Sequence, residues 1–231
     1  MAEIYDTDRF AQLYYAEGLT LDNLALAARF LNTLFFMGDI ESAFVGGWAL
    51  LLRGNTRQTR DIDIAVGTDM PTLKAYLVQQ ARVCFPQTHG ESTVTIFVQT
   101  GKSFDADYPD VVDYPVYVDI IISGYLNTPR PLHEGTEFIF PETENIQGTG
   151  PFQVLNLFNQ MKAKLSAFRT RGKLSKNDFI DLIFLVFRYY DDIPTFKHSL
   201  NSEEIAMFVE EYQEVYGQDE ESVAWVKEVL Q

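Results

Sequence analysis

The stretch FVGGWALLLRGNTRQTRDIDIAV, residues 44–66, decides the fold of this chain. An apolar run ending at Val45 is followed by Gly46 and Gly47, and then by the apolar residues 48–52. This order predicts a strand, a diglycine turn and a short helix. Because glycine has no Cβ, the backbone at such a turn can approach a ligand closely. The amino-terminal end of the following helix attracts anions, so we expect an anion-binding turn at this place.

Two aspartates at the end of the same stretch alternate with apolar residues. In Asp61-Ile-Asp-Ile-Ala-Val66, the alternation predicts a half-exposed strand with Asp61 and Asp63 on one face. Asp119 lies in a second strand-like run, YVDIII. If the two strands pair, three carboxylates converge opposite the glycine turn, and their repulsion is relieved by a divalent cation such as Mg²⁺. A lone D-x-D is more often a pair of surface acids, but the diglycine and Asp119 favour the metal site.

The rest of the chain divides into an α/β part, residues 1–148, and a helical part, residues 149–231, with the boundary in the stretch QGTGP. Apolar periodicity predicts helices over 20–37 and 71–83 in the first part, and strands over 94–98, 116–122 and 137–140. In the second part it predicts helices over 151–170 and 176–190, a third opened by Asn201 and a fourth over 219–230. Ser175 is placed to cap the helix over 176–190, with Asp178 as its capping-box partner.

The composition is that of a folded protein. The chain has 231 residues, of which 46% are hydrophobic and 22% charged, so it can bury a large core, and classes such as disordered chains and disulfide scaffolds are excluded. The single cysteine, Cys84, excludes an internal disulfide and a Cys-ligated zinc site, and we expect it to be a small buried hydrophobe. No apolar run reaches the roughly 20 residues of a membrane span, and residues 1–10 do not resemble a signal peptide. We expect a cytoplasmic protein with no membrane partner.

The charge is strongly acidic but unevenly distributed. Eighteen Lys and Arg against 33 Asp and Glu give a net charge of −15, which disfavours nucleic acid as a partner. Basic residues nevertheless gather in two places. A cluster of basic residues is more often a solvated surface than a ligand site, but both of these clusters are candidates for phosphate binding. The two clusters are Arg53, Arg57 and Arg60, and the acid-free segment that holds Lys162, Lys164, Arg169, Arg171, Lys173 and Lys176.

These motifs resemble a known family. A diglycine, a D-x-D strand and a later strand with one aspartate are similar to the DNA polymerase β type nucleotidyltransferase superfamily. More narrowly, GGWALLLRGNTRQTRDIDI resembles the AbiEii-like, abortive-infection group of nucleotidyltransferases. MKAKLSAFRTRGKLSKNDFIDLIFL is similar to a helical pattern of that group, with Lys164, Asp178 and Asp181 at the matching positions. Asn177 splits the usual basic-acidic pair. The resemblance covers roughly residues 40–190.

The resemblance implies a fold and a reaction. The fold is a small mixed sheet that carries the active site, with a C-terminal helical subdomain. The reaction is the Mg²⁺-dependent transfer of a nucleoside monophosphate from an NTP such as ATP, with release of pyrophosphate. The implied roles are metal binding and catalysis for Asp61, Asp63 and Asp119, with Asp119 also helping to deprotonate the acceptor hydroxyl, and contact with the triphosphate for Gly46, Gly47, Arg57, Arg60 and Lys164.

The acceptor is left open by the sequence. A small-molecule hydroxyl, a protein side chain and a tRNA end all occur in the superfamily, and the net charge favours the small molecule. A rival hypothesis is a catalytically retired nucleotide-binding module. The presence of all three aspartates argues against it, because retired members commonly lose at least one of them. Three further residues have structural explanations: Trp48 as a core residue, Asp178 as a capping residue and Asp181 as a hydrogen-bonding partner of a neighbouring segment.

Overall fold

The computed structural model describes residues 1–141, 151–172 and 175–231. The chain divides into two compact units, Met1–Leu155 and Asn156–Gln231. The predicted boundary at residue 148 lies outside the described residues. The observed division falls later, at Leu155, because a last strand after residue 150 belongs to the sheet of the first unit.

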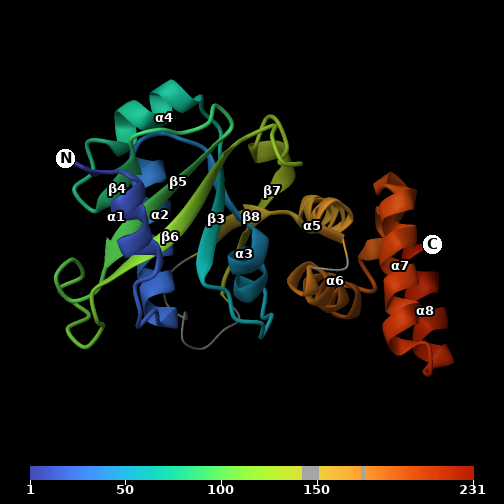
Figure 1. Cartoon of the computed structure of the whole chain (residues 1–231). Helices are drawn as coiled ribbons and strands as arrows, with labels where there is room; N and C mark the ends of the chain where they lie inside the picture. The colour runs from blue at the N-terminus through green and yellow to red at the C-terminus, as the bar shows by residue number, and fades with distance from the viewer. Residues whose placement is uncertain (142–150, 173–174) are drawn as a thin grey trace. The chain divides into compact units, whose positions relative to one another are not determined.

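The described residues of the first unit form one mixed sheet of eight strands, in the order β1-β4-β5-β6-β3-β2-β8-β7 (Figure 1). The pairs β1–β4, β3–β6 and β2–β8 are parallel and the others antiparallel, so the expected mixed sheet is confirmed. The strands are β1 (Glu3–Tyr5), β2 (Ser42–Val45), β3 (Asp61–Val66), β4 (Val83–Pro86), β5 (Thr93–Thr100), β6 (Tyr114–Ile122), β7 (Thr136–Ile139) and β8 (Phe152–Leu155). The helices are α1 (Thr7–Tyr14), α2 (Leu21–Met37), α3 (Gly46–Leu52) and α4 (Met70–Leu77).

One face of the sheet forms the main hydrophobic core. Alternate residues of the central strands point to it, and they pack with apolar residues of α2, α3 and α4. Helix α2 begins where predicted because the Thr20 hydroxyl accepts a hydrogen bond from the Asn23 amide, while the Asn23 side chain accepts one from the Thr20 amide. Trp48 is fully buried in this core, as expected. The strand residues that form it include Phe44, Ile62, Ile64, Val66, Ile96, Val98, Val116, Val118 and Ile120.

The opposite face of the sheet carries the predicted aspartates. Side chains alternate along a strand, so the residues between the core positions of β3 and β6 point to this side. We call it the acid face; it includes Asp61, Asp63 and Asp119. Helix α1 covers part of this side of the sheet, where Leu13 packs against Phe97 of β5.

Two predicted helices are wrong at one end by several residues, and the other predicted ends in the described residues differ by about two residues or fewer. The helix predicted over 71–83 ends at Leu77, and the residues after 82 form β4. The helix predicted from 151 begins at Leu157, because Phe152–Leu155 pairs with β7 and β2 as a strand. The helix predicted over 176–190 ends at Arg188. Strand β1 and helix α1 are absent from the sequence-based prediction.

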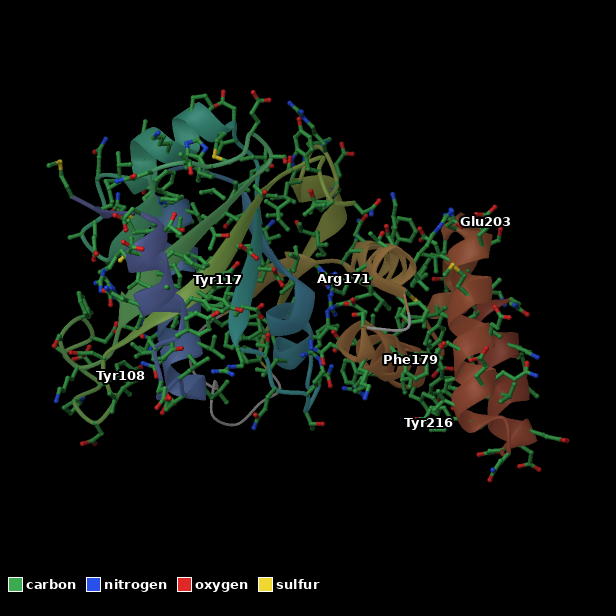
Figure 2. All side chains as sticks on the ribbon, in the orientation of Figure 1. Tyr108, Tyr117, Arg171, Phe179, Glu203 and Tyr216 are labelled. Atoms are coloured by element: carbon green, nitrogen blue, oxygen red, sulfur yellow. The ribbon has the colours of Figure 1, made fainter. Side chains whose placement is uncertain are left out.

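The second unit is helical. Its helices are α5 (Leu157–Arg171), α6 (Lys176–Arg188), α7 (Ser202–Tyr216) and α8 (Glu220–Leu230). The Asn156 side chain caps α5, and Asn201 caps α7. Aromatic residues join α6 to α7: Phe179 stacks on Tyr216 with ring centroids 6.5 Å apart (Figure 2). None of the helices in the described ranges is long and apolar enough to cross a membrane.

Candidate active site

The diglycine turn lies directly against the D-x-D strand. Val45, the last residue of β2, is the register partner of Asp63 on β3, and Gly46 follows with a φ of +62°. A Cβ placed on Gly46 would lie 2.0 Å from the Asp63 Oδ2 atom. Only glycine therefore fits, both because of its positive φ and because the carboxylate occupies the space of a side chain. The predicted order of strand, diglycine and short helix is confirmed, and anion binding at this place stays a prediction.

The second glycine is approached by a cation. A Cβ on Gly47 would lie 2.8 Å from the Arg57 Nη2 atom and 2.9 Å from the Thr59 hydroxyl. The Arg57 guanidinium therefore lies beside the turn, where its Nη1 donates to the Gln58 carbonyl at 3.0 Å. Of the predicted cluster, Arg53 is buried elsewhere and bonds to Glu137 and the Leu155 carbonyl. The structure thus brings Arg57, but not Arg53, to the diglycine.

The three aspartates share the acid face. Asp63 and Asp119 are register partners in the parallel pair β3–β6, and Asp61 lies two residues before Asp63 on the same face. The carboxylates of Asp61 and Asp119 each accept a hydrogen bond from a threonine hydroxyl. The Thr59 Oγ1 donates to Asp61 at 2.7 Å, and the Thr95 Oγ1 donates to Asp119 at 2.6 Å.

The convergence of the three carboxylates on a metal stays a prediction. Among the described residues, no group of three or more His, Cys, Asp and Glu side chains is arranged so that it could hold a metal ion. The carboxylates of Asp61 and Asp119 accept hydrogen bonds from different threonine hydroxyls, and the carboxylate of Asp63 lies beside Gly46. Register places the three carboxylates on one face of the sheet.

Asp119 is in an environment that opposes its negative charge. Burial raises its pKa above the ordinary value, and the charge of Asp61 raises it further, while hydrogen bonds from Thr95 and Tyr117 act in the opposite direction. The net direction is upward. A cation next to these carboxylates would relieve the repulsion and stabilise the charged form of Asp119.

A cavity of about 470 Å³ opens beside Asp119 on the acid face. Residues from α1, the Ala16–Glu17 segment, β5 and β6 line it, together with Arg60 and Asp61. Figure 2 labels one of its lining residues, Tyr117, on β6. Sequence reasoning did not find this cavity, because α1 was not predicted and because tyrosines in strands are usually packing residues.

Lys164 lies in the second unit and is engaged by acids. Its Nζ atom lies 3.0 Å from the Asp178 Oδ1 and 2.7 Å from the Asp181 Oδ2, and all three side chains are buried. The Arg171 guanidinium also reaches Asp178, at 3.0 Å. The Ser175 hydroxyl caps α6 by accepting from the Asp178 amide, as expected, but the Ser175 amide donates to the Gly172 carbonyl and not to Asp178, so the expected capping box is not formed. The predicted contact of Lys164 with a triphosphate stays a prediction, but the ion pairs give this lysine a structural role.

The rest of the basic segment 162–176 is also partly neutralised. The Arg169 Nη2 atom lies 3.3 Å from the Glu203 Oε2 at the start of α7. Lys173 lies outside the described residues. Although the segment itself contains no acidic residue, several of its basic side chains therefore form ion pairs with acidic residues of α6 and α7.

Several solved structures share this fold. An antigenic nucleotidyltransferase-like protein from Paracoccidioides brasiliensis matches with a TM-score of 0.62 at 16% identity, over 89% of this chain and 94% of its own. JHP933 from Helicobacter pylori matches with a TM-score of 0.51 at 16% identity, over 93% and 92%. The antibiotic-resistance factor ANT(2'')-Ia matches with a TM-score of 0.50 at 12% identity, over 88% and 98%.

These likenesses establish the fold. The chain has the fold of nucleotidyltransferase-like proteins, so the predicted fold is confirmed. No protein-family model matches the sequence, and no curated protein matches it.

Proposed function

We propose that this chain is a Mg²⁺-dependent nucleotidyltransferase. It transfers a nucleoside monophosphate from an NTP to a hydroxyl of a small-molecule acceptor and releases pyrophosphate. Because one fold serves many functions, the proposal rests on the site and not on the fold alone. The observation that carries it is the close approach of Gly46 to the Asp63 carboxylate, on a sheet face shared with Asp61 and Asp119.

The residues present suit a divalent cation by chemistry and register. Carboxylate oxygens are the ligands that Mg²⁺ prefers, and three carboxylates on one face, one with an upward-shifted pKa, favour a nearby positive charge. Asp61, Asp63 and Asp119 would hold the metal. When bound, two such ions help to activate an attacking oxygen and to stabilise a leaving oxygen in phosphoryl-type transfer.

The chain's own groups bind and orient the reactants. The backbone of Gly46 and Gly47 would contact the triphosphate, and Arg57 beside Gly47 supplies positive charge for the phosphate oxygens. Lys164 is a further candidate for this contact, whereas Arg60, the residue before β3, lines the cavity beside Asp119. The hydroxyls of Thr59 and Thr95 hold the two carboxylates that they bond in fixed orientations.

The transfer itself is a single displacement at phosphorus. The acceptor oxygen forms a bond to the α-phosphorus, while the bond from that phosphorus to the oxygen bridging the α- and β-phosphates breaks. The electron pair of the broken bond leaves with pyrophosphate. The proton of the acceptor hydroxyl passes to the Asp119 carboxylate, which acts as the general base.

The charge of the chain favours a small acceptor over nucleic acid. The net charge is −15, and much of the basic segment 162–176 is paired with acids of α6 and α7. The resemblance to the AbiEii-like group keeps a second candidate open, a toxin-type enzyme that modifies a tRNA end or a protein.

The metal and nucleotide sites are tested together by thermal unfolding. We expect ATP with Mg²⁺ to raise the melting temperature, since a ligand that binds only the folded state stabilises it. Asp61→Asn with Asp63→Asn should abolish the Mg²⁺-dependent part of this shift. The control is Asp107→Asn with Asp110→Asn, which removes the same charge from exposed positions. A double variant at 61 and 63 that keeps the full shift would place the metal elsewhere.

The substitution Asp119→Asn separates an enzyme from a retired module. The Asp119→Asn variant should bind ATP within a few fold of the wild-type affinity but should lose the slow release of pyrophosphate. The reason is that Asp119 is needed to take up a proton only when the hydroxyl of the acceptor substrate attacks. Wild-type protein that binds ATP and Mg²⁺ but releases no pyrophosphate with any acceptor would favour the retired module.

A further inference from the structure

The cavity beside Asp119 lies on the opposite side of the aspartates from the diglycine. In the sheet order β5-β6-β3-β2, the diglycine follows β2, whereas the cavity is lined from β5 and β6. The aspartates on β3 and β6 stand between them. A phosphate group held at Gly46 and Gly47 and a second molecule in the cavity would therefore meet at Asp61, Asp63 and Asp119.

The wall of this cavity is aromatic. Tyr14 of α1 and Tyr117 of β6 meet edge to face, with centroids 5.5 Å apart and an interplanar angle of 74°. Tyr117 continues to Phe97 of β5, at 5.6 Å and 85°. Tyr14 is half exposed, so part of its ring is open to a ligand. Such rings offer flat faces with negative charge density, which stack on other rings and attract cations.

The charged groups of the cavity are mainly acidic. Glu17, Asp61 and Asp119 line it, against one cation, Arg60. Asp61 and Asp119 are assigned to the metal, so Glu17 is the lining carboxylate left for a ligand, and together with the aromatic faces it favours a positively charged one. The triphosphate is assigned to the diglycine and Arg57.

We propose that this cavity binds the acceptor, and that the acceptor is a small hydroxyl compound carrying a flat ring and an ammonium group. The ring lies against Tyr14 and Tyr117, and the ammonium faces Glu17. Tyr14 and Glu17 thus determine which acceptor is chosen, while the groups on β3 and β6 carry out the chemistry. This inference rests on the proposed nucleotidyl transfer, which it deepens by naming the class of acceptor.

Three probes of equal ring size but different charge test the proposal. Tyramine carries an ammonium group, tyrosol (4-(2-hydroxyethyl)phenol) is neutral, and 4-hydroxyphenylacetate is an anion. Binding of each is measured by calorimetry to the full chain with Mg²⁺ and a nonhydrolysable ATP analogue. We expect the affinity to fall in the order tyramine, tyrosol, 4-hydroxyphenylacetate. Equal affinities, or the reverse order, would overturn the proposal.

Variants identify the site of binding. Tyr14→Leu and Glu17→Gln should each weaken tyramine binding about two- to fivefold, as expected for loss of a cation–π or ion-pair contact at exposed side chains. The matched control is Tyr125→Leu, which removes an equally exposed tyrosine outside this cavity and should change nothing. Unchanged tyramine affinity in both variants would place the probe elsewhere.

The affinity for the ATP analogue separates this inference from the proposed function. Both variants should bind the analogue and Mg²⁺ within about twofold of wild type, since they lie away from the diglycine. If the analogue binds but tyramine does not, the acceptor assignment fails and the proposed function stands. If Tyr14→Leu weakens the analogue instead, the cavity holds the base of the nucleotide. If wild type binds neither, the proposed function itself fails.

Discussion

At the scale of the residue, Gly46 is the position that the site tolerates least. Its φ is positive, and the Asp63 carboxylate fills the space where a Cβ would lie. Gly46→Ala should lower stability by more than the roughly 1–2 kcal/mol of left-handed backbone strain, and should abolish the stabilisation by ATP and Mg²⁺, because the methyl group displaces the carboxylate. Urea unfolding and thermal shifts measure the two effects.

Gly172 provides the control for this substitution. Its φ of +65° is close to that of Gly46, but a Cβ there would meet no atom within 4 Å. Gly172→Ala should therefore show the strain without the loss of nucleotide binding. Equal loss of binding in both variants would mean that strain, not collision with Asp63, governs the site.

Lys164 should stabilise the second unit through its buried ion pairs. Lys164→Ala leaves Asp178 and Asp181 buried without their shared cation, and breaking a buried pair in this way typically costs about 3–5 kcal/mol. Urea unfolding measures the loss. Lys162→Ala, on an exposed position of the same helix, should stay within about 0.5 kcal/mol of wild type. If Lys164→Ala behaves like this control, the buried cluster is not a stabilising unit.

At the scale of the element, local signals account for what could be predicted. Helix α2 has a cap at Thr20, an apolar stripe and Gly38 after its end, and β3 has strict alternation, so both are found without tertiary information. Strand β8 is different, because its apolar residues suit either state and its pairing with β2 joins positions 44 and 154. Strand β1 has only three residues, too few for a period.

The site divides in the same way. The diglycine and the three aspartates could be predicted from the sequence. The glycines, Asp61 and Asp63 lie close together in the chain, and Asp119 lies in an apolar run. The threonines that hold the carboxylates could not be predicted, since Thr95 meets Asp119 only through the register of β5 and β6. Likewise, the pairing of Lys164 with acids 14 and 17 positions later requires the packing of two helices, which no periodicity shows.

The helices α5 and α6 should lose stability in acid. Burial alone raises the pKa of Asp178, but Lys164, Ser175 and Arg171 outweigh it and hold the pKa below its ordinary value of 3.8. A lowered pKa in the folded state stabilises the fold above the unfolded value and loses that contribution as the pH falls through the folded pKa. We expect this loss to begin near pH 4. Asp178→Asn should remove that part of the acid dependence in urea titrations at successive pH values; an unchanged profile would contradict the assignment.

At the scale of the whole molecule, the charge decides which partners approach. With a net charge of −15 and much of its basic segment paired, the chain should not bind tRNA measurably at about 0.15 M salt. Lys176→Glu should change neither this result nor the affinity for ATP. Fluorescence anisotropy with labelled tRNA is the measurement. A steep fall of tRNA affinity with salt, abolished by Lys176→Glu, would instead support an RNA acceptor.

The position of α1 has a consequence for how such a protein can diversify. The wall formed by Tyr14 and Glu17 comes from the first 17 residues, whereas the glycines and aspartates come from positions 46–119. In the proposed reaction, Tyr14 and Glu17 of the first stretch bind the acceptor together with Tyr117, and the second stretch carries the groups for the chemistry. Substitutions confined to the first stretch should therefore change which acceptor is bound and leave the proposed chemistry of the second stretch intact.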